Sequence, residues 1–214
     1  MRFRALPVAI LLFGYLAGLA AQNVQVLRPV DEAPQNPDFL AFRTRLKEIV
    51  SKHDTKALLE VLHPDIRASF GSDHGIPAFV AMWTLNEASS ELWKELGTVI
   101  NLGGTFSGPS IFTAPYTFSN WPNDVDSFEF MAIIGTNVRI RTQPSTEAPV
   151  LATVSYAILE NDRDAKPVEG WTAVKFQSKR GYVSSQFIRS PIDYRARFEY
   201  QDGRWRMVFF LAGD

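Results

Sequence analysis

Residues Gly170 to Ile188 read GWTAVKFQSKRGYVSSQFI, and this stretch alternates apolar and polar side chains around a charged turn. Alternation with a period of two predicts half-buried β-strands, so the stretch predicts two strands joined by a hairpin. Segments nearby in the chain show the same pattern, namely EFMAIIG, NVRIRTQ and PVLATVSYAILE. The chain is therefore predicted to be almost entirely β-strand over residues 128–190.

This strand-rich region carries a series of ordered sequence markers. They are Val138, Ile140 and Arg141 in a first strand, Pro144, Ser145 and Thr146 in a turn, Val150 and Leu151 in a second strand, then Gly170–Trp171 with Val174, Gly181–Tyr182–Val183 and Phe187–Ile188. Together they resemble the bacterial SH3-like domain over roughly residues 130–190. The resemblance implies a small five-stranded β-barrel of a kind common in exported proteins.

The same resemblance implies a binding site made of aromatic side chains. Its members would be Tyr156, Trp171, Tyr182 and Phe187, with Arg141 nearby as a partner for a carboxylate. The implied ligand is a peptidoglycan stem peptide or a protein of the cell envelope. The alternative is that a tryptophan in such a strand serves only the core of the barrel.

The first residues have the composition of a secretory signal peptide. Arg2 and Arg4 precede an apolar run from Ala5 to Leu19, and small residues follow at Ala20 and Ala21. Residues 1–21 are therefore predicted to be removed on export, which places the mature protein in the periplasm or outside the cell. An uncleaved anchor is the alternative, and no later segment is long enough to span a membrane. The chain contains no cysteine, so no disulfide supports the fold.

The region between the leader and the strands predicts a helical domain. Residues 22–35 are interpreted as a linker, and residues 36–127 as an α+β domain whose first two helices are capped by Asn36 and Asp54. Residues 105–123 are rich in Gly, Pro, Ser and Thr and predict a long loop or a loosely strand-like connection. The fold class is thus α+β.

The last segment, residues 191–214, predicts a hairpin that turns at Asp202–Gly203. Helices first and a terminal hairpin last weakly resemble the cone-shaped fold of ketosteroid-isomerase-like proteins. In that arrangement the hairpin returns to the N-terminal domain and the barrel is an insertion. The alternative is that the hairpin extends the sheet of the barrel.

Motifs for catalysis, metals and cofactors are absent from the sequence. The three histidines have no zinc spacing, and there is no nucleophile elbow, phosphate-binding loop or dinucleotide fingerprint. NDVDS, at residues 123–127, offers two carboxylates as a calcium loop would, but the remaining ligands are missing and a turn is favoured. A net charge of -1 argues against nucleic acid as a partner. No cofactor, metal or catalytic residue is predicted.

Three functions remain open at this point. The preferred one is an exported, non-catalytic binding protein of the cell envelope. The second is an enzyme or small-molecule binder with a pocket between the N-terminal helices and the hairpin, lined by Phe79, Trp83, Trp93 and Phe209, with Asp73–His74 as an acid-base pair. The third is a structural protein that its barrel fastens to a partner.

Overall fold

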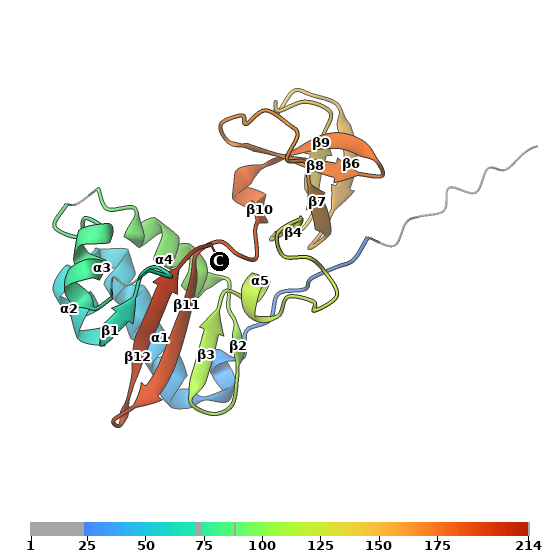
Figure 1. Cartoon of the computed structure of the whole chain (residues 1–214). Coiled ribbons are helices and arrows are strands. Elements are labelled where there is room, and N and C mark those ends of the chain that lie inside the picture. Colours follow the sequence, from blue (N-terminus) through green and yellow to red (C-terminus); the bar gives the residue numbers. More distant parts are fainter. Residues whose placement is uncertain (1–23, 72–73, 88, 214) are drawn as a thin grey trace, which may run out of the picture.

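The computed structural model describes residues 24–71, 74–87 and 89–213. The chain is a mixed α+β protein, as predicted, and its strands form two separate sheets (Figure 1). The predicted signal peptide and Asp73 lie outside the described residues. Within the described ranges, no helix combines the length and the apolar character needed to cross a bilayer.

The first two helices begin at the predicted caps. The side chain of Asn36 accepts a hydrogen bond from the Phe39 amide at 3.0 Å, and Asp54 does the same for Ala57 at 3.0 Å. The helices of the N-terminal part are α1 (Pro37–Lys52), α2 (Thr55–Val61), α3 (Ile76–Met82) and α4 (Leu92–Asn101). A 3₁₀ turn, η1 (Ala33–Gln35), precedes α1.

The first sheet has the strand order β1-β12-β11-β3-β2. Its strands are β1 (Leu62–Arg67), β2 (Thr105–Phe106), β3 (Ile111–Ala114), β11 (Arg195–Gln201) and β12 (Arg204–Leu211). β11 and β12 form the predicted terminal hairpin, and its turn residues Asp202 and Gly203 both have the positive φ that a tight hairpin turn needs. The hairpin pairs with β1 and β3, so the alternative that it extends the other sheet is wrong.

Two sequence predictions in this region need correction. β3 is an internal strand of the first sheet, although residues 105–123 predicted a long loop or only a loosely strand-like connection. The alternation of Ile66, Ala68 and Phe70 in DIRASFG, residues 65–71, predicts a short strand, but β1 begins earlier, at Leu62, and contains Pro64. A proline is tolerated there because β1 lies at the edge of the sheet, where one side of the backbone has no strand partner.

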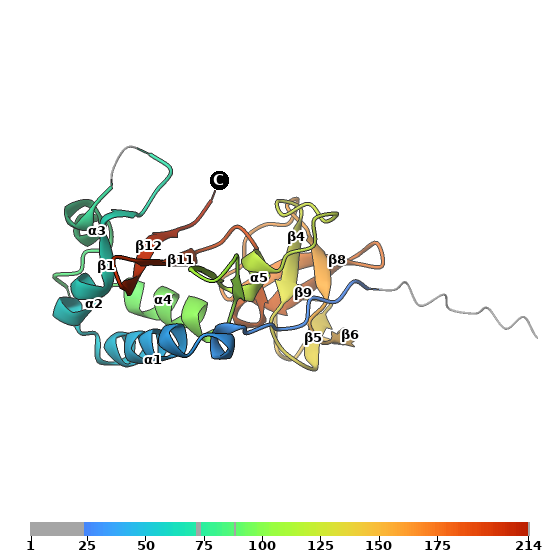
Figure 2. The same cartoon turned by 90° about the horizontal axis from the view of Figure 1, so that it is seen from below.

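Aromatic rings join α1 to the first sheet. The fully buried ring of Phe39 lies 4.2 Å from that of Phe112 on β3, 5.6 Å from Phe198 on β11 and 4.8 Å from Trp205 on β12, centroid to centroid. Figure 2 shows α1 and α4 running together along this face of the sheet. Burial of these rings supplies the main stabilisation of a unit that has no disulfide.

The second sheet has seven strands in the order β10-β4-β7-β8-β9-β5-β6. They are β4 (Phe130–Ile133), β5 (Val138–Arg141), β6 (Val150–Val154), β7 (Ile158–Asn161), β8 (Trp171–Phe176), β9 (Lys179–Ser184) and β10 (Ile188–Arg189). The predicted barrel had five strands, whereas this sheet has seven, and no pairing within the described residues joins its outer strands β10 and β6. Apolar side chains from strands throughout the sheet nevertheless share one core, which requires a strongly curled sheet.

The stretch from Gly170 to Ile188 forms the predicted hairpin. β8 and β9 pair from Trp171 opposite Ser184 to Phe176 opposite Lys179. Gly181 is required in β9, because a Cβ at this position would lie 2.5 Å from the side chain of Ile140. Close approach of two strands is therefore the reason for this glycine.

The second sheet is inserted between two neighbouring strands of the first. Ala114, at the end of β3, lies opposite Ala196 near the start of β11, and the chain between them forms the short helix α5 (Tyr116–Ser119) and the second sheet. Within the insertion, Ile133 of β4 lies opposite Ile188 of β10. The chain thus enters the second sheet on β4 and leaves it on the adjacent strand β10. The two ends of the insertion therefore lie close together, and β3 and β11 can pair directly in the first sheet.

Residues Val24–Gln35, here called the N-terminal strap, contact both sheets. The backbone amide of Leu27 donates to the Tyr156 carbonyl at 2.8 Å, and the Glu32 amide donates to Gly104 at 2.9 Å. Leu27 is buried in a small cluster with Tyr116 and other residues between the sheets. Burial raises the pKa of Tyr116 to about 12, so its phenol is neutral at physiological pH. The described part of the predicted linker is therefore packed against the protein along its length.

An ion pair holds the strap to α1 and generates a pH-dependent prediction. Arg43 is buried and donates to both carboxylate oxygens of Asp31, at 2.6 and 2.8 Å. Burial opposes ionisation of Asp31, but the hydrogen bond and charge of Arg43 outweigh it, so the pKa of Asp31 lies below its ordinary value of 3.8. Its contribution to stability is therefore complete above the unfolded-state pKa and is lost as the pH falls through the lower folded-state pKa.

We expect Asp31→Asn to lower the free energy of unfolding by about 1 kcal/mol near pH 7, because the pair is bidentate but half-exposed on the aspartate side. Urea denaturation should show that the gap to the unsubstituted protein narrows as the pH is lowered to about 2.5. Glu60→Gln is the matched control, because the Arg45–Glu60 pair is exposed on both sides and should contribute no more than about 0.5 kcal/mol. A gap for Asp31→Asn that stays constant in acid would contradict this account.

Candidate functional site

Three of the five predicted binding residues line one groove on the second sheet. We call it the Trp171 groove, and its volume is about 560 Å³. Its lining comprises Thr136, Asn137, Val138, Arg139, Arg141, Thr146, Trp171, Ser184, Gln186 and Phe187. Trp171 is half-buried and Phe187 has 43% of its surface exposed, so both leave aromatic surface open to a ligand.

Local turns bring these two rings to the same groove. Gly170 has a positive φ of 75°, and the turn before it lets the Trp171 amide donate to Val168 at 3.1 Å. The Gly170 carbonyl accepts a hydrogen bond from Ser185 at 2.9 Å. Ser185 starts the 3₁₀ turn η2 (Ser185–Phe187) that carries Phe187. The Gly-Trp pair and the closing aromatic are thus connected through the backbone.

The groove is positively charged. Arg141 donates from its guanidinium to the Ala148 carbonyl at 2.7 Å, which fixes the side chain beside the groove while leaving other donors unused. Arg139 lies two residues earlier on β5, on the same face of the strand, and is exposed. No aspartate or glutamate lines the groove among the described residues. The groove is therefore complementary to a ligand that carries carboxylates.

The remaining two predicted residues lie outside the groove. Tyr182 is the cross-strand partner of Arg141 on β9, yet it does not line the cavity. Tyr156 has a positive φ of 55°, and its backbone bonds to Gly135 and to Leu27 of the strap. Tyr156 thus lies where the second sheet meets the N-terminal strap. Arg139, which sequence reasoning did not single out, was detectable from its alternation with Arg141.

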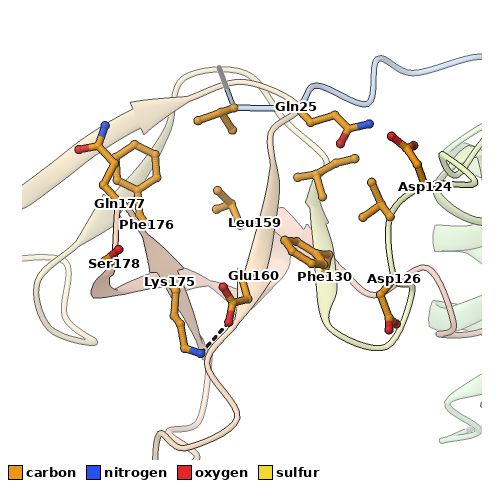
Figure 3. Close-up of a pocket in the computed structure, with 13 residues that line it drawn as sticks. Gln25, Asp124, Asp126, Phe130, Leu159, Glu160, Lys175, Phe176, Gln177 and Ser178 are labelled. Carbon is orange, nitrogen blue, oxygen red and sulfur yellow. Dashed lines mark hydrogen bonds and ion pairs between the residues drawn. The ribbon is translucent and has the colours of Figure 1, made fainter. Parts of the chain in front are cut away.

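A larger cavity lies on another side of the second sheet, with a volume of about 980 Å³ (Figure 3). We call it the Asp124 cavity. The strap, the loop before β4, strands β4 and β7, and the β8–β9 turn form it through Val24, Gln25, Asp124, Val125, Asp126, Phe130, Ile158, Leu159, Glu160, Lys175, Phe176, Gln177 and Ser178. Sequence reasoning noticed Asp124 and Asp126 in NDVDS but gave no cavity, because its walls come from four distant segments.

One ion pair lies at the rim of the Asp124 cavity. Lys175 donates to the carboxylate of Glu160 at 2.6 Å, and this hydrogen bond, together with the charge of Glu160, raises the pKa of Lys175 above its ordinary value. The two charges neutralise each other. Within the described residues, no group of three or more histidine or acidic side chains is arranged to hold a metal ion.

The rings proposed to line a pocket in the N-terminal part belong mainly to its core. Phe79, Trp83 and Trp93 are buried, and the Trp83 ring lies 5.2 Å from that of Phe210 and 4.9 Å from that of Tyr194. His74 is exposed and forms a β-bridge with Arg67, while Asp73 lies outside the described residues. Packing of rings against one another therefore fills the space around Phe79, Trp83 and Trp93. A cavity of about 670 Å³ does lie between α1, α2 and the hairpin, but other residues line it, among them Phe42, Val61 and Trp205.

Neither protein-family models nor curated proteins give a match to this chain.

The charge difference between the two cavities predicts selective quenching of tryptophan fluorescence. Of the five tryptophans, Trp171 lies beside Arg139 and Arg141, whereas the half-buried Trp121 donates from its indole to Val125, between Asp124 and Asp126. Because each surface concentrates counter-ions, iodide should quench Trp171 preferentially and caesium should quench Trp121. Trp171→Phe should remove most iodide quenching and little caesium quenching. Iodide quenching that is unchanged in Trp171→Phe would contradict a positive, open groove.

Proposed function

We propose that this protein is an exported, non-catalytic binding protein of the cell envelope, and that its Trp171 groove binds the carboxylate-bearing stem peptides of peptidoglycan. The observation that carries the proposal is the joint placement of Trp171, Phe187, Arg139 and Arg141 around one groove. Aromatic faces provide apolar contact area, and arginines provide charge-assisted hydrogen bonds to carboxylates. The resemblance of residues 130–190 to SH3-like domains supports the same ligand class.

The barrel form of the second sheet is part of this proposal. Val138 and Ile140 of β5, Val174 of β8 and Val183 of β9 share one apolar core with Ile188 of β10. A core common to opposite parts of the strand order is what a curled, barrel-like sheet produces. The predicted leader, residues 1–21, supports an extracytoplasmic location for this domain.

Retention on purified peptidoglycan sacculi tests the proposal. We expect the mature protein to sediment with sacculi, and Trp171→Ala and Phe187→Ala each to weaken binding by about tenfold or more, because truncated aromatic anchors typically have effects of that size. Arg139→Glu should also weaken binding without affecting folding, since its side chain is exposed.

Tyr200→Ala is the matched control, because Tyr200 is as exposed as Phe187 but belongs to the first sheet. Circular dichroism should show that all four variants remain folded. Absence of retention, or equal retention of the tryptophan and control variants, would eliminate peptidoglycan as the ligand of the groove.

A further inference from the structure

We propose that the Asp124 cavity is a second binding site and that it takes a peptide segment bearing lysine or arginine side chains from a partner protein. This site is separate from the Trp171 groove, with which it shares no lining residue. The inference goes beyond the binding of peptidoglycan and does not depend on it.

The floor of the cavity is apolar. Ile158 and the half-buried Phe130 contribute apolar surface from one face of the β4–β7–β8 ladder, and Leu159 and the half-buried Phe176 contribute it from the other face. Figure 3 shows Asp124 and Asp126 along one side of the cavity, Phe176 and Gln177 along the opposite side, and Leu159 between them. An occupant therefore contacts hydrocarbon in the middle and polar groups at the rim.

The rim carries a net negative charge. Glu160 and Lys175 compensate each other, which leaves Asp124 and Asp126. Asp126 accepts one hydrogen bond from the Phe128 amide at 2.7 Å and retains its other oxygen for a ligand. The carboxylate of Asp124 has no hydrogen bond or ion pair with any residue that the structure describes. Two exposed carboxylates thus line an open cavity, and the lysine in its lining, Lys175, is paired with Glu160.

These features together select the chemistry of the occupant. Lysine and arginine cover apolar surface with their methylene groups while the charged end reaches a carboxylate, and the faces of Phe130 and Phe176 also attract cations. A divalent metal is a poor match, because it needs more oxygen ligands than these two side chains provide. An organic cation with a hydrocarbon stem therefore fits best.

The size of the cavity favours a peptide over a single amine. At about 980 Å³ it lies at the upper end of the roughly 300–1,000 Å³ range of sites that enclose a drug-sized ligand. That space accommodates several residues of an extended chain. The Trp171 groove on the same sheet has the opposite charge, so one site favours cationic ligands and the other favours anionic ligands.

Titration with two synthetic peptides tests the inference. The probes are acetyl-Val-Lys-Val-Lys-Val-amide and the same peptide with glutamate in place of lysine, and binding is followed through the methyl signals of Ile158 and Leu159. We expect saturable shifts with the lysine peptide alone. Asp124→Asn combined with Asp126→Asn should weaken its binding by about tenfold, because two ion pairs are removed while the shape is kept.

Glu147→Gln combined with Glu169→Gln is the matched control, since it removes the same charge from exposed loop positions beside the second sheet that do not line the cavity. Trp171→Ala should leave binding of the lysine peptide unchanged, so failure at this site is distinguishable from failure at the groove. Equal binding of the two peptides, or an equal loss in the control variant, would overturn the inference. If n-butylamine bound as tightly as the lysine peptide, the site would be one for small amines and the peptide assignment would be wrong.

Discussion

The ladder between β3 and β11 is the interaction on which the arrangement depends. It places Phe112 beside Phe198 and Ala114 beside Ala196, and thereby builds the sheet surface that receives the ring of Phe39 from α1. Because these two strands are neighbours in space but far apart in the sequence, everything between them becomes an insertion. The second sheet is therefore connected to the first through the end of β3 and the start of β11, which are adjacent. The N-terminal strap provides a third connection.

Aromatic and charged side chains are distributed differently over the two sheets. The first unit packs many of its aromatic rings against one another but leaves Phe70 and Tyr200 exposed, and the second sheet leaves Trp171 and Phe187 partly open. Cavities of opposite charge lie on the same small sheet, one beside Arg139 and Arg141 and the other beside Asp124 and Asp126. The two proposals, one for each cavity, rest on this difference in charge.

Local signals in the sequence predicted local features well. The caps at Asn36 and Asp54, the Asp202–Gly203 turn and the β8–β9 hairpin all depend on residues close together in the chain. β3 was missed because glycine, proline and serine surround it, and its strand conformation depends on pairing with β11. Trp171 and Phe187 were expected to act together because of the resemblance to SH3-like domains, and the short-range turn at Gly170 connects their backbones. The Asp124 cavity was not predicted, since no local sequence pattern brings its four segments together.

Formation of an engineered disulfide tests the β3–β11 ladder most directly, because the chain has no cysteine of its own. Thr113 and Arg197 lie directly opposite each other, in the register where the Cα atoms of an antiparallel pair are about 4.5 Å apart, within the range that a disulfide spans. Thr113→Cys with Arg197→Cys should cross-link on mild oxidation of the folded protein. Val150→Cys with Arg197→Cys should not, because Val150 lies on the outer strand of the other sheet. Cross-linking of the second pair instead of the first would show that the hairpin belongs to the second sheet and would contradict the account.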